Sequence, residues 1–128
     1  MTRRILVLSL LATVMLAAAG PARAGEIKPH MLGWERILTL EYEPVAKGDK
    51  TAVEGSVTNI SPYHIVGVRI LIDSLDAGGQ VTAQRVAWVP GELSGGGHLF
   101  FSVPAAAAPA YRVRVYSYDR VESIGDHR

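Results

Sequence analysis

The sequence predicts an all-β protein, an immunoglobulin-like sandwich of two antiparallel sheets with six to seven strands, preceded by a cleaved signal peptide. Three observations predict this fold class. Apolar and polar residues alternate with a period of two in short segments, glycine- and proline-rich turns separate these segments, and no stretch keeps a helical period for long. Long glycine-rich crossings favour a two-sheet sandwich over a closed barrel.

The first 24 residues have the build of a secretory signal peptide. Arg3 and Arg4 precede an apolar run from Ile5 to Ala19, and Ala22 and Ala24 supply the small residues of a signal peptidase site. A membrane anchor is the alternative, but spanning a bilayer takes roughly 20 apolar residues. We therefore expect cleavage after Ala24 and export, to the periplasm or to the outside of the cell, with no membrane anchor afterwards.

Composition narrows the classes of partner and chemistry. Cleavage would remove three arginines and leave 10 basic against 12 acidic residues, a net charge of −2. Nucleic acids and anionic membranes are therefore not expected partners, because both require a concentrated positive field. The chain has no cysteine, which excludes disulfides, thiol chemistry and cysteine-based metal sites.

The remaining chain has the length of one domain. We predict a loose N-terminal segment over residues 25–35, a β-sandwich domain over residues 36–122 and a C-terminal tail over residues 123–128. The predicted strands are Arg36–Tyr42, Thr51–Asn59, His64–Leu75, Gln80–Val89, His98–Val103 and Ala110–Asp119.

Turn chemistry supports these strands. Lys47–Lys50 contains Gly48 and reads as a solvated turn, and Asp76–Gly79 predicts a hairpin. Pro90–Gly97 is predicted as a crossing loop, because a missing amide donor and several glycines disfavour a strand interior. We expect Trp88 to fill the space between the two sheets. His64–Leu75 should place Val66, Val68, Ile70 and Ile72 on one face and Arg69 and Asp73 on the other.

One stretch resembles a known family. Gly55-Ser56-Val57-Thr58-Asn59-Ile60-Ser61, followed by an alternating apolar strand and Leu75-Asp76-Ala77-Gly78-Gly79-Gln80-Val81, is similar to the FxLYD-type domains of bacterial envelope proteins. Ser74 stands before Leu75-Asp76 where the family has Leu-Tyr-Asp, so the naming aromatic residue is absent. The resemblance covers residues 51–122 and implies an immunoglobulin-like, non-enzymatic envelope module. From its own chemistry, Asn59 before Ser61-Pro62 is predicted to shape the turn.

We find no constellation that commits the chain to a reaction. The four histidines, His30, His64, His98 and His127, lack metal-ligand spacing, although the fold could bring His64 and His98 together. Ser94 lies outside any nucleophile elbow. The acidic pairs Asp73/Asp76 and Asp119/Glu122 are interpreted as solvated turn acids. We therefore expect no catalytic residue, no cofactor, no metal and no enzymatic activity.

The most suggestive surface is the outer face of the last predicted strand. Arginine and tyrosine are enriched at protein interfaces, and four such residues alternate there: Arg112, Arg114, Tyr116 and Tyr118. A bulge of one residue would reverse the faces and turn the tyrosines inward. We expect a non-catalytic module that contacts another envelope protein or acts as a structural accessory. The alternative is a carbohydrate or small-ligand binder. The sequence indicates neither the partner nor the oligomeric state.

Overall fold

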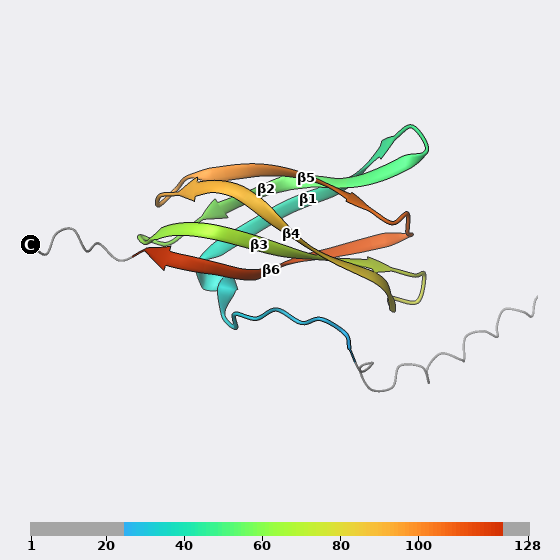
Figure 1. The fold of residues 1–128 in the computed structure, drawn as a ribbon, viewed down its shortest axis with the longest axis horizontal. Coiled ribbons are helices and arrows are strands. Elements are labelled where there is room, and N and C mark those ends of the chain that lie inside the picture. Colours follow the sequence, from blue (N-terminus) through green and yellow to red (C-terminus); the bar gives the residue numbers. More distant parts are fainter. Residues whose placement is uncertain (1–24, 122–128) are drawn as a thin grey trace, which may run out of the picture.

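The structure is a computed structural model that describes residues 25–121 (Figure 1). The predicted signal peptide, residues 1–24, and the predicted tail lie outside the described residues. A short 3-10 helix, η2 (Trp34–Arg36), precedes the first strand. The strands are β1 (Leu38–Lys47), β2 (Lys50–Asn59), β3 (His64–Leu75), β4 (Val81–Leu93), β5 (His98–Ala105) and β6 (Ala110–Val121).

The six strands form two layers. Sheet 1 has the order β1-β2-β5 and sheet 2 the order β4-β3-β6, and all paired neighbours are antiparallel. Figure 1 shows the two sheets stacked over each other. The predicted all-β sandwich is confirmed. The strand orders correspond to strands A-B-E and C′-C-F of an immunoglobulin-type sandwich, which places β6 at the position of strand F.

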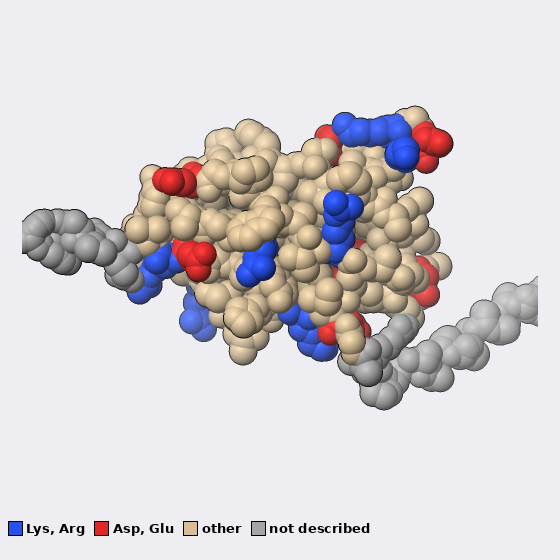
Figure 2. Space-filling model, in the orientation of Figure 1, with Lys and Arg blue, Asp and Glu red and all other residues tan. Residues whose placement is uncertain are grey.

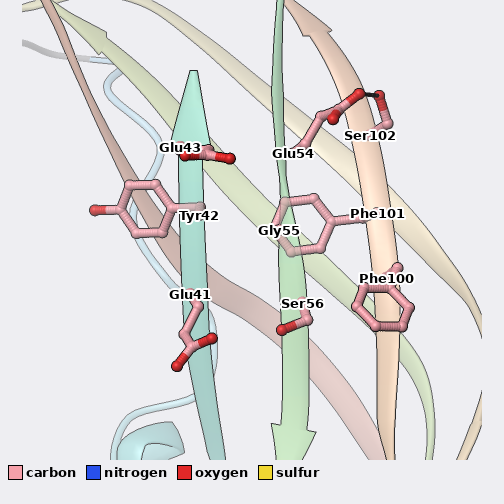
Figure 3. Close-up of a pocket in the computed structure, with 9 residues that line it drawn as sticks. All are labelled: Glu41, Tyr42, Glu43, Glu54, Gly55, Ser56, Phe100, Phe101 and Ser102. Carbon is pink, nitrogen blue, oxygen red and sulfur yellow. Dashed lines mark hydrogen bonds between the residues drawn. The ribbon is translucent and has the colours of Figure 1, made fainter. Parts of the chain in front are cut away.

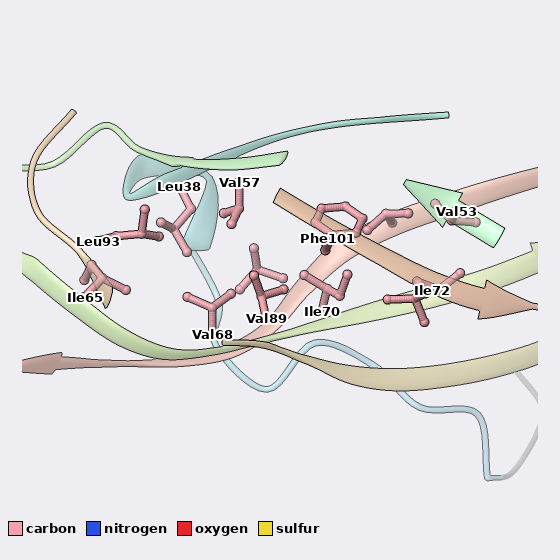
Figure 4. Close-up of a cluster of buried hydrophobic side chains, with 13 residues drawn as sticks. Leu38, Val53, Val57, Ile65, Val68, Ile70, Ile72, Val89, Leu93 and Phe101 are labelled. Carbon is pink, nitrogen blue, oxygen red and sulfur yellow. The ribbon is translucent and has the colours of Figure 1, made fainter. Parts of the chain in front are cut away.

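One apolar core fills the space between the sheets. Alternate residues of the central strands point into it, among them Val53 and Val57 of β2 and Val68, Ile70 and Ile72 of β3. Figure 4 shows these side chains meeting between the layers. The period of two in the sequence therefore predicts the core residues of β2 correctly, and those of β3 from Val68 onward. The other buried core residues are Leu38, Ile65, Val89, Leu93, Phe101, Val103, Val113 and Val115.

The start of β3 differs from the prediction. Gly67 adopts a φ of 63° and interrupts the ladders on both sides of β3, where the register shifts between Val66 and the residues after Gly67. The bulge puts Ile65 rather than Val66 into the core. A bulge adds one residue to one strand, so the faces reverse across it.

The two predicted turns are confirmed. Gly48 has a φ of 68° between β1 and β2, a conformation that costs glycine little. In the turn after β3, the Asp76 carboxylate Oδ1 accepts hydrogen bonds from the amides of Gly78 and Gln80, both at 2.9 Å. The aspartate thus holds the hairpin with its own side chain.

The predicted crossing loop is wrong in its first half. β4 continues through Pro90 and Gly91 to Leu93, and these two residues form the bulged part of its ladder with β3. β4 is an edge strand and Pro90 lies in its bulge. These are the two places in a sheet that tolerate a residue without an amide donor. The prediction for Trp88 is also wrong: it pairs with Arg69 on the outer face and is 63% exposed.

The segment predicted to be loose lies along the outer face of sheet 2 (Figure 1). We call residues 25–33 the N-terminal strap. The amide of Ile27 donates to Gln84 Oε1 at 2.7 Å, and Gln84 Nε2 donates back to the Ile27 carbonyl at 2.9 Å. Farther along, the His30 amide donates to the Tyr116 carbonyl at 2.9 Å. These contacts join the strap to β4 and β6.

Candidate functional site

The outer face of sheet 2 holds the arginines that the sequence singled out. Arg112 and Arg114 of β6 both contact Asp73 of β3, which is 0% exposed. Asp73 Oδ2 accepts from Arg112 Nε at 2.9 Å, Arg112 Nη2 at 2.7 Å and Arg114 Nη2 at 2.6 Å. The interpretation of Asp73 as a solvated turn acid is therefore wrong. A buried carboxylate needs such partners to offset its desolvation.

The ion cluster continues to the strap and carries an excess of positive charge. Gln84 Nε2 donates to Asp73 Oδ1 at 2.8 Å and also holds Ile27 of the strap. Two guanidinium groups face one carboxylate. The Arg112 side chain is 42% exposed, so the surplus charge reaches the surface beside β6.

A bulge in β6 separates the two tyrosines of the predicted face. Arg69 pairs with Ser117 and Ile70 with Val115, so Tyr116 is the extra residue. Tyr116 stays on the outer face, whereas Tyr118 packs against the apolar core. The predicted alignment therefore holds for Arg112, Arg114 and Tyr116, and fails for Tyr118.

The outer face of sheet 2 also carries a row of residues that the sequence analysis did not assemble. The guanidinium carbon of Arg69 lies 5.0 Å from the ring centroid of Trp88 and 5.2 Å from that of Tyr116. Arg69 Nε also donates to Ser117 Oγ at 2.9 Å, which fixes the guanidinium between the rings. We call Trp88, Arg69 and Tyr116 the cation–π row, because each ring faces a cation at favourable distance.

The absence of a side chain at Gly67 shapes the surface beside this row. A Cβ at Gly67 would lie 2.9 Å from Asp119 Oδ2 and 3.7 Å from Trp88 Cζ3. The indole and the Asp119 carboxylate therefore approach each other over bare backbone. The exposed Trp88 ring, the Asp119 carboxylate and the Arg69 guanidinium therefore lie close together.

The row could have been found from the hairpin. If Leu75 pairs with Gln80 across the turn, every even-numbered residue of β4 shares a face with the odd-numbered residues of β3. Trp88 then lies on the outer face with Arg69. The bulge near Ser74 shifts the register but keeps this parity. The size of the indole alone predicts a buried Trp88, and that prediction is wrong.

The outer face of sheet 1 carries a shallow, acidic groove of about 710 Å³ (Figure 3). Three glutamates line it, Glu41, Glu43 and Glu54, together with Phe100, which is 74% exposed. Lys47 Nζ lies 2.8 Å from Glu54 Oε2, and Ser102 Oγ donates to the same oxygen at 2.8 Å. Hydrogen bonds from Lys47 and Ser102 lower the pKa of Glu54 below its ordinary 4.5.

Among residues 25–121, the candidates for catalysis or metal binding do not converge, and the candidates Glu122 and His127 lie outside the described residues. His64 Nε2 lies 3.0 Å from Glu92 Oε1 in sheet 2, whereas the His98 ring meets Phe100 edge-on in sheet 1. Residues 25–121 hold no group of three His, Cys, Asp or Glu side chains arranged for a metal ion. Ser94 lies in the turn between β4 and β5, where its carbonyl accepts from the Gly97 amide.

Charge is sparse on the face seen in Figure 2. Lys, Arg, Asp and Glu side chains are scattered over it, and the densest group lies at the tip of the β1–β2 hairpin (Figure 2).

Within residues 25–121, no helix is long and apolar enough to cross a bilayer. Comparison with known proteins finds no family model, curated protein or solved structure that matches the chain.

Proposed function

We propose that this chain is a non-catalytic, exported module that binds another envelope protein through the cation–π row. One observation carries the proposal: Trp88 is 63% exposed on a strand, with its ring fixed against Arg69. Tryptophan, tyrosine and arginine are the residues that dominate binding energy at protein interfaces. Stacking between two rings holds Arg69 in place, so ordering it on binding costs little entropy.

A photo-crosslinking experiment in the producing cell tests this proposal. A photoreactive amino acid replaces Trp88, and the adducts are separated by mass after irradiation. The matched control carries the same photoreactive residue at Phe100, which is also strongly exposed but lies on sheet 1. We expect a discrete protein adduct from position 88 that is absent from position 100.

Two results would contradict the proposal. The same adducts from both positions would show unspecific collisions, and no adduct from position 88 would show that the row has no protein partner. If an adduct forms, Arg69→Ala should reduce its yield, because the cation–π row then loses the guanidinium that lies between its two ring positions.

The second candidate function is carbohydrate binding at the same place. It is favoured by the Asp119 carboxylate that approaches Trp88 over Gly67. An indole face stacks on the apolar face of a sugar, while carboxylate and guanidinium groups hydrogen-bond its hydroxyls. A glycan array probed with the purified protein and with Trp88→Ala decides it. Absence of a signal that depends on Trp88 rejects this candidate.

Export and family membership are part of the proposal. The resemblance to FxLYD-type domains rests on the sequence motif, in which Gly55 and Val57 face the core and Asn59 and Ser61 form a buried turn. Export is supported by the signal-peptide pattern alone. N-terminal sequencing of protein from the periplasmic fraction should begin at Gly25. A chain that retains Met1 in the cytoplasm would refute export.

A further inference from the structure

The outer edge of β6 is an open position in the sandwich. In an immunoglobulin-type fold, strand G pairs with strand F on the side away from strand C. β6 occupies the F position and pairs with β3, and no seventh strand pairs with it within residues 25–121. An edge strand presents a row of unpaired amides and carbonyls that can template another strand.

The other three edge strands are protected and β6 is not. β1 contains Pro44, β4 contains Pro90 and β5 contains Pro104, whereas the twelve residues of β6 contain no proline. Proline on an edge removes a donor and blocks pairing with another chain. The strap meets β6 at Tyr116 through the His30 amide. Among residues 25–121, no strand pairs with the outer edge of β6 at Ala110–Val115.

Tyr42 on the inner face of sheet 1 also indicates a vacant strand position beside β6. Tyr42 pairs with Gly55, which pairs with Phe101, and Phe101 is buried in the core. Tyr42 therefore belongs to the inner face, yet it is 39% exposed. Figure 3 shows its ring projecting past the edge of β1, away from β2. β1 contacts β6 across the sandwich, and we expect a strand added beside β6 to lie against this ring.

We propose that the edge of β6 at Ala110–Val115 accepts an extended, acidic segment of a partner protein as the seventh strand of the sandwich. The charge of the edge selects this occupant. Arg112 and Arg114 carry one positive charge more than Asp73 neutralises, and cross-strand neighbours of opposite charge stabilise a sheet. The apolar residues of the segment, at alternate positions, would lie on the same face as Val113 and Val115 and pack on Tyr42. A second copy fits less well, because antiparallel pairing of two β6 strands sets their arginines against each other.

This inference rests on the proposed role as a protein-contact module but uses a different surface. Binding by strand addition gives affinity through main-chain hydrogen bonds and specificity through alternate side chains. The probe is a synthetic peptide of alternating valine and glutamate, about seven residues long, which matches an ordinary strand. The matched peptide carries lysine in place of each glutamate.

The experiment follows amide hydrogen exchange of the purified, cell-processed protein by NMR. With the acidic peptide we expect alternate amides of residues 110–115 to exchange at least about tenfold more slowly. Arg112→Glu should weaken the binding of this peptide about fivefold, since a cross-strand attraction becomes a repulsion. Tyr42→Ala should also weaken it. Arg85→Glu on β4, whose guanidinium contacts the Pro104 carbonyl, is the control and should have no effect.

Several results would overturn the inference. Equal binding of the lysine peptide would remove the charge argument, and protection of β4 or β5 amides would place the strand elsewhere. Concentration-dependent protection of β6 without peptide would identify a second copy as the occupant. If β6 amides are protected without peptide and this protection disappears when residues 123–128 are deleted, the occupant of the edge is the C-terminal tail of the chain itself. Trp88→Ala should leave peptide binding unchanged, so failure at the β6 edge and failure at the cation–π row remain distinguishable.

Discussion

Asp73 is the residue on which the outer face of sheet 2 depends. Its carboxylate is fully buried and is bound by Arg112, Arg114 and Gln84. Asp73→Ala would leave two guanidinium groups without their counter-charge, and breaking a buried ion pair in this way costs about 3–5 kcal/mol. Urea unfolding measures the change. The control is Glu92→Ala, which removes an exposed partner of His64 and should cost less than about 1 kcal/mol. Equal losses in both variants would show that the cluster is not stabilising.

Glu54 predicts a small dependence of stability on pH. Hydrogen bonds from Lys47 and Ser102 lower its pKa below 4.5 in the folded chain, so the stabilisation is present above pH 4.5 and is lost as the pH falls through the folded-state pKa. Glu54→Gln should therefore lower the urea midpoint at neutral pH, and the difference from the wild type should shrink in acid. Glu43→Gln is the control, because Glu43 makes no ion pair within residues 25–121. A difference that stays constant with pH would contradict the assignment.

Local chemistry at single residues was predictable, whereas long-range pairing was not. The structural role of Asn59 follows from the turn sequence and is confirmed: its Oδ1 accepts from the amide and hydroxyl of Ser61. Its Nδ2 also donates to the carbonyl of Leu93, which no local pattern indicates. Asp73 meets its arginines only after β3 and β6 pair, so their alternation in the sequence looks like an ordinary solvated face.

At the scale of elements, the β1–β2 pair depends on a bare position at Gly55. A Cβ there would overlap the carbonyl oxygen of Glu41 and lie 2.8 Å from Tyr42 Cα, both of which are backbone atoms of β1. Gly55→Ala should therefore destabilise the fold by about 1–3 kcal/mol, the usual cost of overpacking, measured by urea unfolding. Gly78→Ala is the matched control, because its nearest neighbour is the Asp76 carboxylate at 3.6 Å. Equal stabilities would show that β1 shifts freely.

The strands themselves were predictable, and the bulges within them were not. The bounds of β3 were predicted as they stand, because its apolar alternation is long and a turn follows it. β4 extends past its prediction, since an edge strand tolerates the missing amide of Pro90. The bulges at Gly67 and Tyr116 depend on how two strands pair, and period two alone gives no warning of either.

At the scale of the whole molecule, both sheets share one core, and the N-terminal strap is hydrogen-bonded to sheet 2 at Gln84 and Tyr116. The chain has no cysteine, so packing and hydrogen bonds alone hold the layers together. Trp34 of η2 packs against the core next to β1, whereas Trp88 lies on the outer face of sheet 2. The two tryptophans therefore report on different parts of the molecule, Trp34 on η2 and its contact with the core and Trp88 on the outer face of sheet 2. A single shared core should make unfolding all-or-none.

Single-tryptophan variants test this cooperativity. Trp88→Phe leaves Trp34 as the reporter within residues 25–121, and Trp34→Phe leaves Trp88. We expect the urea midpoint of each variant to be the same by fluorescence and by far-ultraviolet circular dichroism, with an m-value of about 1–3 kcal/mol per molar urea. Emission should be redder from Trp88, since its ring is exposed to water. If Trp34 reports an earlier transition than the strands do, the strap and η2 unfold as a separate unit. The edge of β6 at Tyr116 would then become free before the sandwich melts, and more of that strand would be open to a partner.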